Sequence, residues 1–316
     1  MSVAVCLLLY GFAVAVLAPR LLHRVSADGA APHLALSAWL AAMGSTLLAW
    51  TVTLILFVID LISHQIGTVP AHFMDSCLVH LHDAAVGRYG GPVQSGLLAL
   101  SGFASLAGMV VAVRLIAALL RSRRRTLEHG RMARMAGRHN AELDAVVLEV
   151  DHPAAYCVAG KPHTVVVSRG VLTALDDEHL EAVLTHERAH LAGRHHLLLA
   201  LTRGLATVLP RIDLFTVGAT EVSRLLEMIA DEAAADVHGR HIVHQALVTL
   251  SEIPTESGLA AHPVLTSRID RLTRPHTPVA LGTRLTATAA ATTATLIPIA
   301  AIIAAFIGIE VCAGLD

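Results

Sequence analysis

The chain has 316 residues, of which 54% are hydrophobic, 15% are charged and 3% are aromatic, and its mean hydropathy is +0.63. Hydropathy of this size excludes an ordinary soluble domain and is typical of a membrane protein. The formal net charge of −2 leaves no overall basic field that could recruit nucleic acid, and the four cysteines show no C-x-x-C spacing, which excludes a zinc ribbon or a disulfide-dense scaffold.

Four apolar stretches are long enough to cross about 30 Å of hydrocarbon, which requires about 20 helical residues. These predicted transmembrane helices lie at residues 2–19, 34–59, 94–120 and 285–312. Arginines follow the first and the third of them, and short cytoplasmic loops carry the excess of positive charge in membrane proteins. We therefore expect a multi-pass protein of the cell (inner or plasma) membrane whose N-terminus lies outside.

This topology divides the chain into three parts. Residues 1–125 hold three transmembrane helices and an external loop at 62–93. Residues 126–280 form a cytoplasmic domain, which contains the functional motifs described below. Residues 281–316 hold the fourth transmembrane helix and a short external C-terminus.

Three of the four cysteines fall at or beyond the outer membrane boundary in this topology, where disulfides can form. We hypothesise that Cys77 pairs with Cys6 or with Cys312, which would tie the external loop to the end of a helix. The alternative is three buried, unpaired thiols.

The cytoplasmic part combines strands and helices. Two β-branched runs, at residues 144–150 and 163–168, predict strands. Asp176 or Asp177 can cap a helix that runs to about residue 200. Further helices are predicted at residues 217–237, 240–252 and 264–273. The fold class is therefore a helical membrane protein with an inserted, small α+β domain in which helices dominate.

The helix that begins at Asp176 or Asp177 carries H-E-x-x-H, formed by His186, Glu187 and His190. Residues four positions apart share one face of a helix, so the two imidazoles can bind one zinc ion while Glu187 acts on water beside it. His195 and His196 continue this predicted helix beyond the motif. Because the chain holds twenty histidines, we assign these two no catalytic role.

A catalytic zinc ion needs a third protein ligand, and the predicted helix at 217–237 offers two sets of carboxylates. Glu227 with Asp231 is one E-x-x-x-D pair, and Glu232 with Asp236 is the other. In either pair the first carboxylate could bind zinc while the second accepts a hydrogen bond from a ligand histidine. The spacing alone leaves both pairs open, as well as a solvated acidic face.

The pattern S-R-x-x-E-x-x-A-D, which starts at Ser223, resembles the third-ligand helix of HtpX-like and BlaR-type integral-membrane metallopeptidases. The segments at 153–175, 176–190 and 261–272 resemble the same group, and three transmembrane helices before the domain with one after it resemble the BlaR/MecR antirepressors more closely. The resemblance implies a gluzincin-type zinc endopeptidase. It implies His186, His190 and Glu227 as the zinc ligands, with Asp231 behind a ligand histidine.

In the mechanism that the resemblance implies, zinc and Glu187 activate water, hydroxide attacks a peptide carbonyl, and Glu187 passes the proton to the leaving amine. The strand at 163–168 would line the cleft and accept substrate as an extra strand, or it is an ordinary sheet edge. Candidate donors to the oxyanion are His262, Arg268, His238 and Arg240. His262 and Arg268 belong to the segment shared with the relatives, and an architectural role for them stays open.

By resemblance, the substrate is a cytoplasmic repressor of the BlaI type, whose cleavage derepresses genes without direct nucleic-acid binding by this protein. BlaR-type sensors carry an external penicillin-binding domain with S-x-x-K, which residues 1–316 do not contain, so we expect no direct acylation by β-lactams. The implied partners are the lipid bilayer, a protein substrate and, as an option, a second copy in a homodimer. The alternatives are an HtpX-like quality-control protease and a non-proteolytic membrane receptor that zinc only stabilises.

Overall fold

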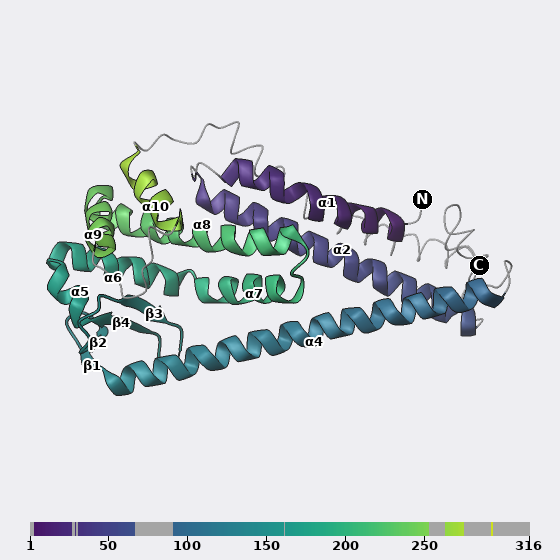
Figure 1. Ribbon diagram of the computed structural model, residues 1–316, viewed down its shortest axis with the longest axis horizontal. Helices are drawn as coiled ribbons and strands as arrows, with labels where there is room; N and C mark the ends of the chain where they lie inside the picture. The colour runs from purple at the N-terminus through teal and green to yellow at the C-terminus, as the bar shows by residue number, and fades with distance from the viewer. Residues whose placement is uncertain are drawn as a thin grey trace, which may run out of the picture.

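The computed structural model describes residues 3–26, 29, 31–66, 91–160, 162–252, 263–274 and 292. Within these residues the chain forms helices and one small four-stranded sheet, which lies at one end of the elongated molecule (Figure 1). Cys77, Cys312, His262 and, apart from residue 292, the predicted fourth transmembrane helix lie outside the described residues.

Three long helices correspond to the first three predicted transmembrane helices. They are α1 (Val3–Ser26), α2 (Pro32–Ile66) and α4 (Gly91–Ala136). By length and composition, the segments Ala4–Arg24, Pro32–Ile59 and Ala99–Ala136 could each cross a membrane. Phe103 and Leu106 are among the large apolar side chains exposed along α4, as expected of a surface that faces lipid.

The helix that contains the third predicted transmembrane segment, 94–120, continues beyond that segment. In the structure α4 continues to Ala136, because residues 121–136 contain strong helix formers and no proline. Arg121–Arg125 therefore lie on a continuous helix, and the predicted domain boundary at 126 falls inside α4. The helix stops before Gly137, where a Cβ atom would lie 2.4 Å from Val146 Cγ1.

The sheet has the strand order β1-β2-β4-β3. Its strands are β1 (Arg138–Asn140), β2 (Ala145–Leu148), β3 (Ala155–Val158) and β4 (Thr164–Ser168). β2 and β4 pair in parallel and match the two predicted strands, whereas the antiparallel strands β1 and β3 were not predicted. The expectation that the strand at 163–168 lies at the sheet edge is wrong, because β3 pairs with β4 and takes that edge itself.

Six helices follow the sheet in the chain. They are α5 (Arg169–Ala174), α6 (Asp177–Ala192), α7 (His195–Val208), α8 (Asp213–His238), α9 (Arg240–Glu252) and α10 (Pro263–Thr273). Asp176 caps α6, and its side chain accepts a hydrogen bond from the backbone N–H of His179. The helix predicted to reach about residue 200 ends at Ala192 instead, because Arg194 adopts a left-handed conformation with φ 50° and starts a new helix.

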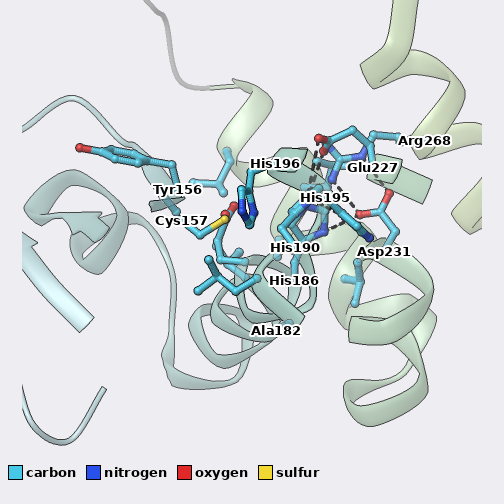
Figure 2. A pocket seen from close by; sticks show the side chains of 18 of the residues that line it. Tyr156, Cys157, Ala182, His186, His190, His195, His196, Glu227, Asp231 and Arg268 are labelled. Atoms are coloured by element: carbon cyan, nitrogen blue, oxygen red, sulfur yellow. Dashed lines mark hydrogen bonds and ion pairs between the residues drawn. The ribbon is translucent and has the colours of Figure 1, made fainter. Parts of the chain in front are cut away.

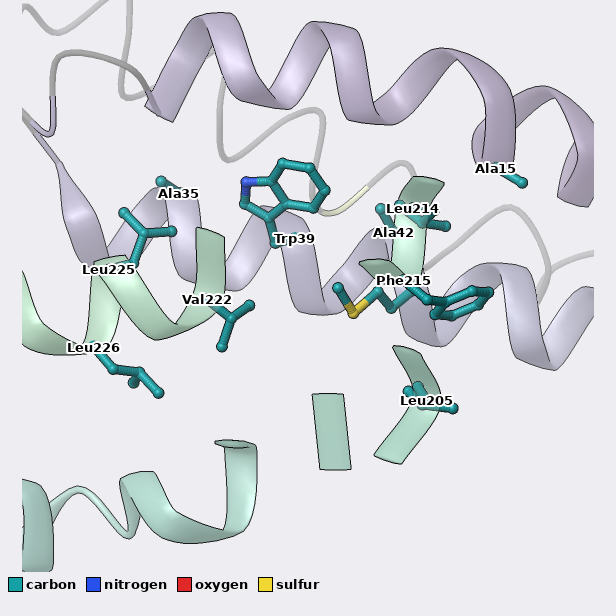
Figure 3. Packing of buried hydrophobic residues seen from close by; sticks show 11 residues of the cluster. Ala15, Ala35, Trp39, Ala42, Leu205, Leu214, Phe215, Val222, Leu225 and Leu226 are labelled. Atoms are coloured by element: carbon teal, nitrogen blue, oxygen red, sulfur yellow. The ribbon is translucent and has the colours of Figure 1, made fainter. Parts of the chain in front are cut away.

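Helix α8 joins the apolar helices to the rest of the molecule. Its first half packs into a buried cluster with α1 and α2, which includes Trp39 of α2 and Phe215 and Val222 of α8 (Figure 3). Gly218 permits this close approach, since a Cβ atom there would lie 2.1 Å from Met43 Cε. The second half of α8 lies against α6 and α9, so one continuous helix connects the apolar bundle with the motif-bearing helices.

Polar contacts fix the turn between α1 and α2 on the same helix. Arg224 of α8 donates from Nη2 to the Ser26 carbonyl at 2.7 Å, and the Ser26 hydroxyl donates to Glu221 Oε2 at 3.1 Å. Arg271 of α10 donates from Nε to the Gly29 carbonyl at 2.8 Å. The turn is therefore held by side chains from α8 and α10.

The sheet depends on a close backbone approach at the start of α5, which gives a first prediction. A Cβ atom on Gly170 would lie 2.1 Å from the Asp151 carbonyl oxygen and 2.8 Å from Pro153 N, and backbone atoms cannot yield as a flexible side chain can. We expect Gly170→Ala to lower the free energy of unfolding by about 1–3 kcal/mol, measured by denaturant unfolding in detergent. Gly44→Ala is the control, because a Cβ atom there meets nothing within 4 Å. Equal stability of the Gly170 variant and the wild type would contradict this packing.

Candidate metal centre

Two helices bring three potential metal ligands together (Figure 2). His186 and His190 lie one turn apart on α6, and Glu227 approaches from α8. The two Nε2 atoms are 3.2 Å apart, and the Glu227 carboxylate oxygens lie 3.5 Å from His186 Nε2 and 3.6 Å from His190 Nε2. Ligand atoms about 2.0–2.1 Å from a tetrahedral zinc ion are roughly 3.3 Å from one another, so this spacing fits one zinc ion. Two imidazoles and a carboxylate are also a donor set that zinc prefers.

The second carboxylate of the same pair stands behind His186. Asp231 lies one turn after Glu227 on α8, and its Oδ1 is 3.0 Å from His186 Nδ1. His186 thus offers Nε2 to the metal site, while its other ring nitrogen, Nδ1, can donate a hydrogen bond to Asp231. Such a hydrogen bond fixes the orientation of a ligand histidine. The other predicted register does not reach the site, because Glu232 pairs with Arg271 and Asp236 is exposed.

Arg268 of α10 balances the negative charge of two carboxylates on α8, those of Glu227 and Asp231. Its Nε and Nη2 bond to the two Asp231 oxygens at 2.8 and 2.7 Å, and its Nη1 lies 3.1 Å from Glu227 Oε2. Every nitrogen of the guanidinium group therefore faces a carboxylate. This geometry favours the architectural role that the sequence left open for Arg268, while a donor role toward an oxyanion stays a prediction.

The electrostatic state of the ligands reflects these contacts. Burial alone would raise the pKa of the Glu227 carboxyl, but hydrogen bonds from His186 and His190 and the charge of Arg268 hold it well below its usual range. Burial would lower the pKa of the His186 imidazole, but its bonds to Asp231 and Glu227 outweigh burial and raise the pKa to about 9. Without metal, His186 therefore carries the positive charge that the two carboxylates attract.

Glu187 lines the same cavity as the three potential ligands. Burial raises the pKa of its carboxyl above the usual range. Cys157 of β3 interacts with this carboxylate through its thiol, and burial followed by the negative charge of Glu187 raises the pKa of the thiol to about 12. The Cys157 thiol is therefore protonated at neutral pH and can donate to Glu187.

The cavity around these groups has a volume of about 480 Å³, within the range of small-molecule pockets. Edge strand β3 contributes Tyr156 and Cys157 to its lining, and α9 contributes Val243 and Leu247. An exposed strand edge can bind an extended peptide by main-chain hydrogen bonds. The strand that lines the cavity is thus β3, which the sequence did not predict because its four residues are too short to show a clear alternation.

Two of the other residues that the sequence analysis considered line the cavity, and two do not. His195 and His196 line the cavity, although they belong to α7 and do not continue the ligand helix as the sequence suggested. His238 lies 2.9 Å from the Thr185 hydroxyl through Nε2, and Arg240 donates to the Arg271 carbonyl. Neither of these two residues is among those that line the cavity, so the structure does not place them as donors to a reacting group.

Comparison with known proteins adds one finding. Residues 118–212 match the family model of Peptidase family M48. The matched segment runs from α4 through the sheet to α7 and includes His186, Glu187 and His190, but it ends before Glu227. No curated protein and no solved structure gives a significant match. Over this segment the chain is similar to metallopeptidases of family M48, which are typically zinc-dependent, and the His-His-Glu cluster agrees with that class.

Proposed function

We propose that this protein is a zinc-dependent endopeptidase of the membrane. The observation that carries the proposal is the convergence of His186, His190 and Glu227 from two helices, with Glu187 in the same cavity. Bound zinc supplies a Lewis acid that polarises a carbonyl and lowers the pKa of water. Glu187 would accept a proton from the attacking water and return it to the leaving amine. Edge strand β3 holds the substrate backbone beside these groups.

The substrate that we propose is a cytoplasmic repressor of the BlaI type, and the supporting argument is the resemblance of the motif segments to BlaR-type antirepressors. The arginines that follow the first and third apolar helices favour a cytoplasmic location for the catalytic domain in a cell membrane. The continuous helix α8 also supports a membrane-coupled enzyme, because it carries Glu227 and Asp231 and packs on α1 and α2. A homodimer remains part of this proposal, and direct nucleic-acid binding does not.

Metal removal is the first test. Treating the full chain in detergent with a strong chelator should abolish cleavage of a protein substrate such as casein, and added zinc should restore it, because His186, His190 and Glu227 then regain their metal. The measurement is cleavage rate against zinc content. Cleavage that persists in protein free of zinc would contradict the proposal.

The substrate class is tested in cells by mass spectrometry of new protein N-termini. Cells with the wild-type protein are compared with cells that carry Glu187→Gln. New termini in one DNA-binding repressor support the antirepressor function. New termini in many membrane proteins contradict it and favour quality control, and no difference in any termini contradicts proteolysis itself.

A further inference from the structure

His190 has a neighbour that no motif assigned. It offers Nε2 to the metal site, so its other ring nitrogen, Nδ1, needs a partner. That atom lies 2.8 Å from Nδ1 of His195, a residue only 4% exposed, and the two rings meet edge to face with centroids 4.8 Å apart. Figure 2 shows His195 directly against His190.

The break between α6 and α7 is what brings His195 to this position. Gly193 ends α6, and Arg194 turns the chain through a left-handed conformation so that α7 begins at His195. The His195 ring then folds back over Gly193, where a Cβ atom would lie 2.3 Å from His195 Nε2. On an unbroken helix, residues 190 and 195 would point about 140° apart around the helix axis, so their side chains would not share a face.

The hydrogen bond fixes where each ring carries its proton. A histidine that binds metal through Nε2 must carry its remaining proton on Nδ1. His190 therefore donates from Nδ1 to His195 Nδ1, and His195 must carry its own proton on Nε2. In this arrangement His195 does for His190 what Asp231 does for His186, but with a neutral acceptor in place of a carboxylate.

We propose that His195 is a positioning residue of the metal centre, which holds His190 in the ring orientation and tautomer that expose Nε2 to the metal. The inference rests on the proposed zinc site. It also accounts for the local sequence, because glycine at 193 and the left-handed turn at 194 both serve to bring the His195 ring against His190.

The test measures zinc affinity of the full chain in detergent by competition with a chromophoric chelator. Loss of a hydrogen-bonding partner of a ligand histidine typically weakens metal binding 10- to 100-fold, so we expect a loss of about that size in His195→Leu. His195→Asn should recover most of the affinity, because its side-chain oxygen can replace Nδ1 as the acceptor. A purely structural role would not distinguish Leu from Asn in this way.

Two further variants test whether the effect is specific to the contact between His195 and His190. His196→Leu is the matched control, because the neighbouring His196 lines the same cavity but its Nδ1 has no hydrogen-bond partner among the described residues, so zinc affinity should stay unchanged. Gly193→Ala keeps an allowed backbone, with φ −74°, but pushes the His195 ring away, so it should weaken zinc binding in a protein that still folds.

The outcomes separate the two proposals. If the wild type binds no zinc, the proposed function fails. If the wild type binds zinc and His195→Leu binds it equally tightly, the zinc site stands and the role of His195 is overturned. Equal weakening in His195→Leu and His195→Asn would also overturn that role.

Discussion

Replacing Glu187 by glutamine should abolish peptide hydrolysis and leave zinc content unchanged. Glutamine keeps the size of the side chain but cannot accept the proton from water, and general acid–base catalysis by a positioned side chain contributes about 100- to 10,000-fold to a rate. Glu187 itself is not one of the three clustered ligands, so the metal should remain. The measurement is turnover of a protein substrate together with the zinc content of the same sample.

Glu181→Gln is the matched control for this prediction. Glu181 lies on the same helix, α6, but forms a surface ion pair with Arg188 at 3.4 Å and does not line the cavity. Its variant should cleave at the wild-type rate. Retained cleavage by Glu187→Gln would eliminate the proposed mechanism, and a loss of zinc in that variant would show that Glu187 belongs to the ligand set.

Replacing Arg268 by methionine should strongly destabilise the metal-free protein. The Asp231 carboxylate, whose side chain is 2% exposed, loses the guanidinium group that binds both of its oxygens. The substitution also removes the positive charge next to Glu227. Removing one member of a buried ion pair costs about 3–5 kcal/mol where the remaining charge is left without a partner. His186 Nδ1 stays 3.0 Å from Asp231, so the loss should fall at the lower end of that range. We expect a loss of about 3 kcal/mol, measured by denaturant unfolding in detergent. Arg268→Lys should lose less, since it keeps the charge without the planar fork.

Arg169→Met is the control for Arg268. Arg169 also contacts carboxylates, those of Asp151 and Glu149, but all three side chains are at least half exposed, so the loss should stay below about 1 kcal/mol. The result also decides between the two roles that the sequence left open. If Arg268→Met lowers the cleavage rate without lowering stability, the residue acts on the reacting groups and the architectural account is wrong.

Local sequence patterns were sufficient for the parts of the site that lie on single helices. Four-residue spacing put His186 and His190 on one face of α6, and the same spacing put Glu227 and Asp231 on one face of α8. The choice of Glu227 over Glu232 needed a family resemblance, because both registers have the same spacing. The structure brings Glu227 to the histidines and pairs Glu232 with Arg271.

The remaining parts of the site depend on contacts between distant segments. Arg268 meets Asp231 across 37 positions of sequence, and no periodicity encodes such a pair. Strand β3 owes its place at the edge to pairing with β4, and its own four residues carry little signal. The approach of His195 to His190 requires a left-handed conformation at Arg194, a residue type that rarely adopts it. Gly193, in L-A-G-R-H-H, was the available signal for a helix end at this point.

X-ray absorption spectroscopy of the zinc-loaded full chain tests the central claim most directly. The account predicts two imidazole nitrogens and carboxylate or water oxygens at about 2.0–2.2 Å, and the loss of bound zinc when Glu227 is replaced by alanine. A sulfur ligand at about 2.3 Å, which only a cysteine or methionine can supply, or an unchanged zinc spectrum in Glu227→Ala would contradict it.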